Sequence, residues 1–314
     1  MKVNDKIFAL KSKISAALTP IVDRPYRLLE IPDYRNIGDI LIFEGELAFL
    51  RTVRHRCLEM ATMRSFAYRL PKISKDELLI FRGGGYFGDM WPSGWAFQRK
   101  VLENYPDNPM IMFPQSTCFV SEKSLRDAVK RYGAHKNLTL CLRDKASYEL
   151  VKNNFPNKSL LVPDMAFFAD IDRFRSANRD CKSTLLMKRT DKEYKHNCRI
   201  DELLSAGDVD VADWGSVNEC GNQIEGMMQR LRCRPRRCSR IYDLFTRYVY
   251  RPYQLKLGVR LLDQYKHIYS TRLHGCLMAL MLGKKVSILD NSYGKISSLY
   301  NTWLSDCDNI ELIG

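Results

Sequence analysis

The chain has 314 residues, 45% of them hydrophobic and 27% charged, which is typical of a compact folded protein and excludes a disordered or fibrous one. The length suits two domains, and one large domain stays open. Fifty Lys and Arg residues against thirty-six Asp and Glu residues give a formal charge of +14. This charge favours anionic partners: phosphorylated small molecules, nucleic acid or an acidic membrane surface.

The apolar segments of the chain are short, and none approaches the roughly 20 residues that a membrane span requires. We therefore expect the chain not to cross a bilayer. In the N-terminal segment 1–22 the apolar stretches are broken by Lys11 and Lys13. Because a secretory signal needs an unbroken apolar region, we expect this segment to be amphipathic and cytosolic.

In the first half of the chain, short apolar runs alternate with segments of helical spacing. This alternation predicts a parallel sheet wrapped by helices. The predicted strands are 27–31, 78–81, 110–113, 138–142 and 160–162. A polar stretch at 170–182 then predicts a linker.

The alternation restarts in the second half, and we therefore predict two Rossmann-like α/β domains facing a cleft. They are residues 1–170 and residues 171–314, and the last helix is a candidate to pack back on the first domain. The predicted elements are strands at 184–187, 209–212, 267–270 and 286–289, and helices at 273–282 and 292–303. Residues 220–260 give no clean helical period, because Pro235 and Pro252 interrupt it, and are predicted to be partly irregular.

Glycine and polar residues gather where the predicted strands end, the edge at which α/β sheets bind ligands. Three successive glycines there let the backbone approach a ligand or bind an anion, although a flexible turn would have the same sequence. Neither a GxGxxG nor a GxxxxGK[ST] pattern is present. The clusters are Asn36–Asp39, Gly83–Gly85, Pro114–Thr117, Arg143-Asp144, Pro163-Asp164, Met187–Arg189 and Ser270–Gly275.

Basic residues are concentrated in residues 230–260, where ten Lys and Arg side chains stand against Asp243 alone. This window carries +9 of the net charge. It is either a solvated basic face or a surface for anionic headgroups. A nucleic-acid interface is a further alternative, with Tyr242, Tyr248, Tyr250 and Tyr253 as stacking side chains, but we do not expect nucleic acid as a partner.

The ten cysteines are scattered and form no CxxC pair. Cys233 and Cys238 come nearest to metal-ligand spacing, but a zinc cluster needs closely paired ligands. We predict reduced structural thiols and no metal site.

In their order along the chain, these motifs resemble the polysaccharide pyruvyl transferase family. The family has N-x-G-D, a glycine triplet, P-Q-S, R-D and S-x-R-x-H-G, and the resemblance spans about residues 34–300. It implies a fold like that of the GT-B glycosyltransferases. It also implies transfer of pyruvate from phosphoenolpyruvate to two hydroxyls of a sugar, as a cyclic ketal.

The resemblance further implies a bacterial enzyme of exopolysaccharide or capsule synthesis, acting in the cytoplasm or at the inner face of the plasma membrane. Its partners would be phosphoenolpyruvate, as donor substrate rather than cofactor, and a lipid-linked glycan acceptor. Peripheral membrane contact would run through residues 230–260. The alternative is a GT-B glycosyltransferase that uses a nucleotide sugar, since fold alone does not separate the two.

With this activity, His274 is expected to be the general acid and Asp39 the general base, with Asp164 as second choice. Arginine forks and backbone N–H groups suit the phosphate and carboxylate of the donor. The residues expected to bind the donor are Arg189, Arg272, Leu273, Gly83, Gly84, Gly85 and Ser116. Those expected to bind the acceptor are Asn36, Gln115, Trp91, Trp95 and Arg143.

Overall fold

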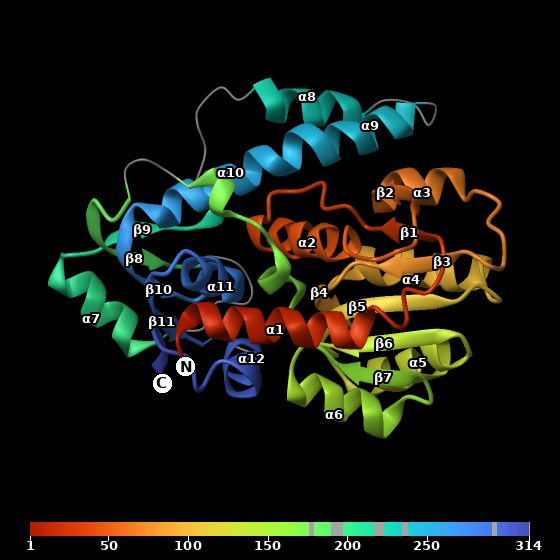
Figure 1. Ribbon diagram of the computed structural model, residues 1–314, viewed down its shortest axis with the longest axis horizontal. Helices are drawn as coiled ribbons and strands as arrows, with labels where there is room; N and C mark the ends of the chain where they lie inside the picture. The colour runs from red at the N-terminus through yellow and green to blue at the C-terminus, as the bar shows by residue number, and fades with distance from the viewer. Residues whose placement is uncertain (176–178, 190–196, 217–222, 234–237, 291–293, 314) are drawn as a thin grey trace.

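The structure is a computed structural model that describes residues 1–175, 179–189, 197–216, 223–233, 238–290 and 294–313 (Figure 1). Within them, strands form two sheets in which every pair is parallel. This confirms the predicted α/β class with parallel sheets.

The first sheet has seven described strands in the order β2-β1-β3-β5-β6-β7, with β4 also beside β5. Its strands are β1 (Tyr26–Leu29), β2 (Cys57–Ala61), β3 (Leu78–Phe81), β4 (Gly84–Phe87), β5 (Met110–Thr117), β6 (Leu138–Leu142) and β7 (Lys158–Leu161). Arg82 and Gly83 thus separate two short strands that both pair with β5, and the other two glycines of the triplet begin β4 rather than forming a loop.

The second sheet has five described strands in the order β12-β11-β10-β8-β9. They are β8 (Lys182–Met187), β9 (Asp210–Ala212), β10 (Tyr265–Ser270), β11 (Lys285–Leu289) and β12 (Ile310–Ile313). The segment predicted as a linker contains the short helix η2 (Asp172–Phe174) and ends at the first residue of β8.

Helices pack against both sheets. They are α1 (Val3–Leu18), α2 (Ile37–Leu50), α3 (Met63–Arg69), α4 (Pro92–Asn104), α5 (Glu122–Gly133), α6 (Lys145–Asn154), η1 (Met165–Phe168), α7 (Cys198–Ala206), η3 (Trp214–Ser216), α8 (Gln223–Arg232), α9 (Ser239–Phe245), the π-helical turn η5 (Thr246–Tyr250), α10 (Arg251–Asp263), α11 (Leu273–Met281) and α12 (Lys295–Trp303). In the described part of the chain, no helix is long and apolar enough to span a membrane.

Helix α2 lies between the two sheets and joins their cores. Every residue in it except Asp39 and Ala48 is buried. It packs against η1, α10 and α11, and one apolar cluster continues through it from Leu28 and Ile80 of the first sheet to Met187 of the second. The two sheets therefore share a core, and the ends of their strands are held at fixed positions.

Gly45 allows α2 to pack directly on η1. A Cβ atom at this position would lie 1.7 Å from the carbonyl oxygen of Met165. Gly45→Ala is therefore expected to lower the free energy of unfolding by about 3 kcal/mol, measured by urea denaturation. Gly226→Ala in α8 is the control, because no atom lies near its added Cβ, and it should leave stability unchanged or raise it. Equal effects of the two substitutions would contradict this packing.

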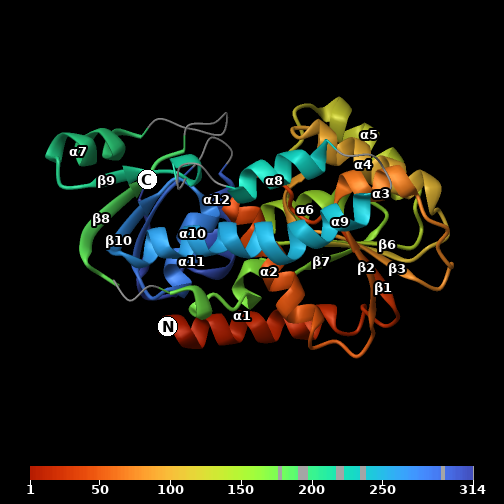
Figure 2. The same cartoon turned by 90° about the horizontal axis from the view of Figure 1, so that it is seen from above.

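The second half also contributes a helical arm, residues 223–233 and 238–263, which crosses over the first half (Figures 1 and 2). Helix α9 packs on α3 and β2. The buried carboxylate of Asp243 accepts hydrogen bonds from Thr62 N at 3.0 Å and from Thr62 Oγ1 at 2.9 Å. Tyr242 Oη donates to Asp33 Oδ2 at 2.6 Å.

For residues 223–232 and 239–260 the helical arm corrects the prediction that the segment 220–260 is partly irregular. Pro252 falls in the first turn of α10, where a missing N–H is tolerated, and the π-helical turn η5 comes directly before it. Pro235, Arg234, Arg236 and Arg237 lie outside the described residues. Of the four tyrosines considered for base stacking, Tyr242 and Tyr250 are buried, so they offer no stacking faces.

Candidate active site

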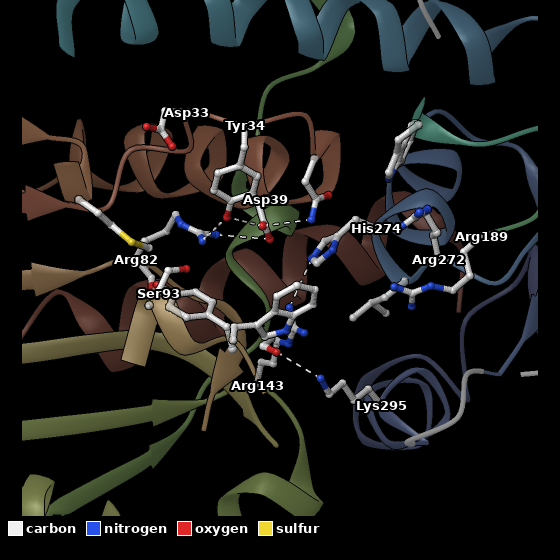
Figure 3. Close-up of a pocket in the computed structure, with 18 of the residues that line it drawn as sticks. Asp33, Tyr34, Asp39, Arg82, Ser93, Arg143, Arg189, Arg272, His274 and Lys295 are labelled. Carbon is white, nitrogen blue, oxygen red and sulfur yellow. Dashed lines mark hydrogen bonds and ion pairs between the residues drawn. The ribbon is translucent and has the colours of Figure 1, made fainter. Parts of the chain in front are cut away.

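A cavity of about 560 Å³ opens where the carboxyl ends of the strands of the two sheets meet (Figure 3). Parallel α/β sheets bind ligands at this edge. The cavity is lined by Asp33, Tyr34, Asn36, Asp39, Met63, Arg64, Arg82, Gly85, Tyr86, Trp91, Ser93, Gly94, Arg143, Arg189, Trp214, Arg272, Leu273, His274 and Lys295. Side chains from both halves therefore contact the same ligand space.

The cavity is strongly cationic. The lining described above includes six Arg and Lys side chains and His274, but only two carboxylates, Asp33 and Asp39. Arginine forks bind phosphate and carboxylate groups through paired hydrogen bonds. The lining is therefore suited to a small ligand with several negative charges.

Asp164 and Arg143 contact the His274 imidazole at its Nε2 atom. Its Nε2 lies 3.3 Å from Asp164 Oδ2 and 3.4 Å from Arg143 Nη1, while Arg143 Nη1 donates to the same Asp164 oxygen at 2.8 Å. Burial alone would raise the pKa of Asp164, but the charges of His274 and Arg143 hold it below its usual range. An ionised, buried Asp164 thus fixes the orientation of the imidazole.

The cluster below His274 joins four of the strand-end motifs. Arg143 Nε donates to Ser116 Oγ at 2.8 Å, and Ser116 Oγ donates to Asp144 Oδ2 at 2.6 Å. Ser116 and Asp164 are buried and do not line the cavity. Both were expected to act on a substrate directly, whereas their positions suit support of Arg143 and His274.

Arg272 and Arg189 line the side of the cavity formed by the second sheet. Arg272 forms a two-pronged ion pair with Asp213, in which Nη2 donates to Oδ2 at 2.6 Å. Arg189 is 7% exposed, and its backbone N–H donates to Thr271 Oγ1 at 2.9 Å. The ion pair with Asp213 fixes the plane of the Arg272 guanidinium before any ligand arrives.

Asp39 lies on the opposite side, in the first turn of α2. Its Oδ2 accepts hydrogen bonds from Tyr34 Oη at 2.6 Å and from Asn36 Nδ2 at 3.1 Å, and its Oδ1 lies 3.4 Å from Arg82 Nη1. Asn36 also caps α2 by accepting from Gly38 N at 3.1 Å. A Cβ on Gly38 would lie 2.9 Å from His274 Nδ1, so the glycine lets α2 approach His274 closely.

Arg82, Tyr34 and Lys295 line the cavity although the sequence did not single them out. Arg82 Nη2 donates to Tyr34 Oη at 2.9 Å. Lys295, in the first turn of α12, donates from Nζ to the carbonyl oxygen of Gly85 at 3.1 Å and so connects the two halves. The position of Arg82 directly before the glycine triplet was the one available signal.

Some of the remaining predicted residues line the cavity, and others form hydrogen bonds to residues in or behind its lining. Gly85, Leu273 and Trp91 line the cavity. Gly83 N donates to the buried Glu46 at 2.6 Å, and Gln115 bonds to Tyr86 N and Arg82 O, at 3.2 and 2.8 Å. Gly84 is next to them in β4 and does not line the cavity.

Trp95 lies away from the cavity. Its ring packs against Phe119 and Tyr132, at centroid distances of 6.4 and 5.5 Å, and Arg131 stacks over it. Trp95 thus fills the space between α4 and the neighbouring core, and of the two tryptophans expected to bind the acceptor, Trp91 lines the cavity.

Glu30 is a buried carboxylate under the cavity floor. It is 1% exposed and accepts a hydrogen bond from Tyr86 Oη at 2.6 Å. Its φ of 69° lies in the left-handed region, which is rare for a non-glycine residue. Burial raises the pKa of Glu30 to about 7, although Arg82 partly opposes this shift.

This shift predicts a pH-dependent loss of stability. The unfolded chain ionises Glu30 near pH 4.5, whereas the folded protein keeps the proton up to about pH 7. The contribution is therefore full below pH 4.5 and is lost as pH rises through 7. Relative to Glu30→Gln, the wild type should lose about 3 kcal/mol between pH 4.5 and 8 in urea denaturation. Glu103→Gln is the control, because Glu103 is exposed at the end of α4. Wild-type and Glu30→Gln curves that stay parallel would contradict the burial of an ionisable Glu30.

Within the described residues, no cluster of three or more His, Cys, Asp and Glu side chains is arranged to hold a metal ion. The cysteines that the structure describes are free thiols. Cys220 is outside the described residues.

Three comparisons relate the chain to known proteins. A family model described as polysaccharide pyruvyl transferase matches residues 36–293. A putative pyruvyl transferase EpsO of Bacillus subtilis is 26% identical, with 100% of this chain and 96% of that protein covered. Pyruvyl transferase 1 of Schizosaccharomyces pombe is 27% identical, with 89% and 70% covered.

A solved structure has a similar fold. It is the crystal structure of the functionally uncharacterised protein KP1_0663 from Klebsiella pneumoniae, with a TM-score of 0.67 and 19% sequence identity. The alignment covers 97% of this chain and 98% of that one. At this identity the likeness supports the fold alone.

Proposed function

Because the chain belongs to the polysaccharide pyruvyl transferase family, we propose that it transfers the pyruvyl group of phosphoenolpyruvate to two hydroxyls of a sugar in a cell-surface polysaccharide precursor. The product would be a cyclic ketal. The observation that carries this proposal is the cationic cavity around His274. Family membership does not favour the nucleotide-sugar alternative. We expect the two sheets to correspond to the two halves of a GT-B fold.

The donor is proposed to bind on the side of the second sheet. Phosphoenolpyruvate carries a phosphate and a carboxylate on three carbon atoms, so its site needs several convergent cationic donors. Arg189, Arg272 and Lys295 supply them around Leu273 and His274. Arginine charge is sufficient for this role, and the proposal includes neither a metal ion nor a further cofactor.

The proposed reaction begins with proton transfer from His274 to the methylene carbon of phosphoenolpyruvate, which makes C2 electrophilic. A sugar hydroxyl then attacks C2, the bond from C2 to the phosphate oxygen breaks, and a second hydroxyl attacks C2 to close the ketal. Two hydroxyl protons leave the sugar. One balances the proton on the new methyl group and the other leaves with inorganic phosphate.

Asp39 is the proposed general base for the sugar hydroxyls. It lines the cavity from the first turn of α2 (Figure 3), whereas Asp164 is buried and paired with Arg143. A general base has to come within hydrogen-bond distance of the hydroxyl proton. This placement supports Asp39 as base and Asp164 as the residue that positions His274.

The acceptor is proposed to enter from the side of the first sheet, where Asn36 and the exposed face of Trp91 line the cavity. Tyr86 and Arg64 are on the same side. The proposed acceptor is a lipid-linked glycan at the cytoplasmic face of the membrane.

The test is an assay of phosphate release from phosphoenolpyruvate with a panel of lipid-linked glycans, followed by mass spectrometry of the glycan. Gain of a pyruvate ketal that accompanies phosphate release would support the proposal. Transfer of a sugar from a nucleotide sugar, with no ketal formed, would overturn it.

Lys295 provides a residue-level prediction for the donor site. Lys295→Met removes one charged donor from the cavity without touching His274, so KM for phosphoenolpyruvate should rise by about 30-fold with little change in kcat. Steady-state kinetics at saturating acceptor measure this. Lys285→Met, at the exposed first residue of β11, is the matched control. A fall in kcat at unchanged KM would place Lys295 outside donor binding.

A further inference from the structure

Large apolar side chains are exposed together on the helical arm. Ile241 is 57% exposed, Leu244 54%, Tyr248 61% and Val249 40%. They belong to α9 and to the π-helical turn that follows it. A row of exposed apolar side chains on consecutive turns is unlike the scattered ones that are normal on a protein surface.

The spacing puts these side chains on one face of the helix. Ile241, Leu244 and Tyr248 are three and four residues apart, so they lie above one another along the helix. The opposite face, with Tyr242 and Tyr250, is buried against the rest of the protein. The solvent-exposed face of the helix is therefore as apolar as a helix face that normally packs against a protein core. We call residues Ile241, Leu244, Tyr248 and Val249 the apolar face.

The charges beside the apolar face have one sign. Between positions 238 and 262 Asp243 is the only acidic residue, and its carboxylate turns inward to Thr62 and Ser65. Arg240 is exposed and Arg247 is half-buried next to the apolar face. Further along α10, Lys256 and Arg260 are exposed.

Other arginines of the basic window have partners inside the protein. Arg251 is buried in an ion pair with Glu44. Arg232 contacts the carbonyl oxygen of Asp33. The basic window is therefore not a uniform surface, and the part that remains outward accompanies the apolar face.

We propose that the apolar face, with Arg240 and Arg247 beside it, docks the protein on an anionic lipid bilayer. Apolar side chains flanked by arginines enter the boundary between headgroups and acyl chains, and the arginines contact anionic headgroups. A second copy of the chain is a poorer partner, because a symmetric contact would bring the same arginines together. A neutral protein surface would offer Arg240 and Arg247 no anionic groups to contact.

The apolar face lies on the arm that borders the active-site cavity. Tyr242, on the inner side of the same helix, donates to Asp33 in the cavity lining. Helix α9 also packs on α3, which contributes Met63 and Arg64 to the lining. Docking on a bilayer would place the cavity near the membrane surface, where a lipid-linked acceptor would lie. Docking itself does not depend on the proposed reaction.

Vesicle flotation with the full chain tests the proposal. The wild type should float with vesicles of phosphatidylcholine and phosphatidylglycerol and bind pure phosphatidylcholine much more weakly. The variant Ile241→Ser, Leu244→Ser, Tyr248→Ser should bind the mixed vesicles about tenfold or more weakly. Arg240→Gln with Arg247→Gln should reduce binding to mixed vesicles and its salt dependence.

The control removes exposed apolar side chains elsewhere. Leu204→Ser with Val211→Ser, in α7 and β9, should bind like the wild type, and melting temperatures show that all variants are folded. Absence of wild-type binding to mixed vesicles, or equal binding by the triple variant, would overturn the proposal. So would a wild-type dimer in light scattering that the triple variant converts to monomer. Since flotation measures no turnover, failure of the proposed reaction would leave this result unchanged.

Discussion

Replacing His274 with alanine is expected to lower kcat for phosphate release from phosphoenolpyruvate by about 10³-fold. A positioned general acid contributes about 10²–10⁴-fold to the rate. The contact with buried Asp164 fixes the orientation of the His274 imidazole, as a general acid requires. The binding of phosphoenolpyruvate should change little, because Arg189, Arg272 and Lys295 remain. Stopped assays of phosphate release at saturating donor and acceptor measure the effect.

His267 provides the matched control for His274. It lies on β10, seven residues earlier, and its Nε2 is 2.8 Å from Ser287 Oγ, away from the cavity lining. His267→Ala should keep kcat within about threefold of the wild type. If His274→Ala turned over near the wild-type rate, the proton would have to come from another group, and the proposed acid would be wrong.

Replacing Arg272 with lysine is expected to lower kcat/KM for phosphoenolpyruvate by about 10³-fold although the charge is kept. Arg272 uses a planar fork whose orientation is fixed by Asp213, and an ammonium group cannot form the same paired hydrogen bonds. Loss of two charge-assisted hydrogen bonds corresponds to about 4 kcal/mol. Most of the effect should be in KM, in contrast to His274→Ala.

Arg260→Lys is the control, because Arg260 is exposed on α10 and does not line the cavity. It should leave both kinetic constants unchanged. A wild-type KM for Arg272→Lys would show that charge alone matters at this position, and the fork would then have no role in donor binding.

The sequence was sufficient for nine of the twelve described strands and for most of the residues around His274, but it did not predict β2, β4 or β12. Apolar runs such as 78–81 and 138–142 coincide with β3 and β6, because buried parallel strands are uniformly apolar. The strand-end motifs converge because the carboxyl ends of parallel strands share one edge of a sheet. This geometry brings Arg143, Asp164 and His274 together from distant parts of the chain.

The sequence was insufficient where a role depends on a partner far along the chain. Lys295 is one basic residue among many, and only the packing of α12 brings it to Gly85. Glu30 and Arg82 lie in one buried cluster, joined by Tyr86 Oη, which donates to Glu30 Oε2 and to the carbonyl oxygen of Arg82, and no local pattern indicates this. Trp95 was expected to bind the acceptor because it lies just beyond the glycine triplet, but α4 directs its ring to the core.

The helical arm was missed for a different reason. Its arginines and Pro252 weaken the helical period, and its outward face is apolar, so the usual contrast between a buried apolar face and a polar outer face is absent. Contacts with the first half, such as Asp243 with Thr62, stabilise these helices. Tertiary packing here decides a structure that local propensity leaves open.

The most direct test of the account is a calorimetric titration of the protein with phosphoenolpyruvate, since the donor site is formed without the unknown acceptor. We expect saturable binding at one site, loss of binding in Arg272→Lys, retention in His274→Ala, and no comparable heat with nucleoside diphosphates. No saturable binding of phosphoenolpyruvate, or tighter binding of a nucleoside diphosphate at the same cavity, would contradict the assignment of this cavity to pyruvyl transfer.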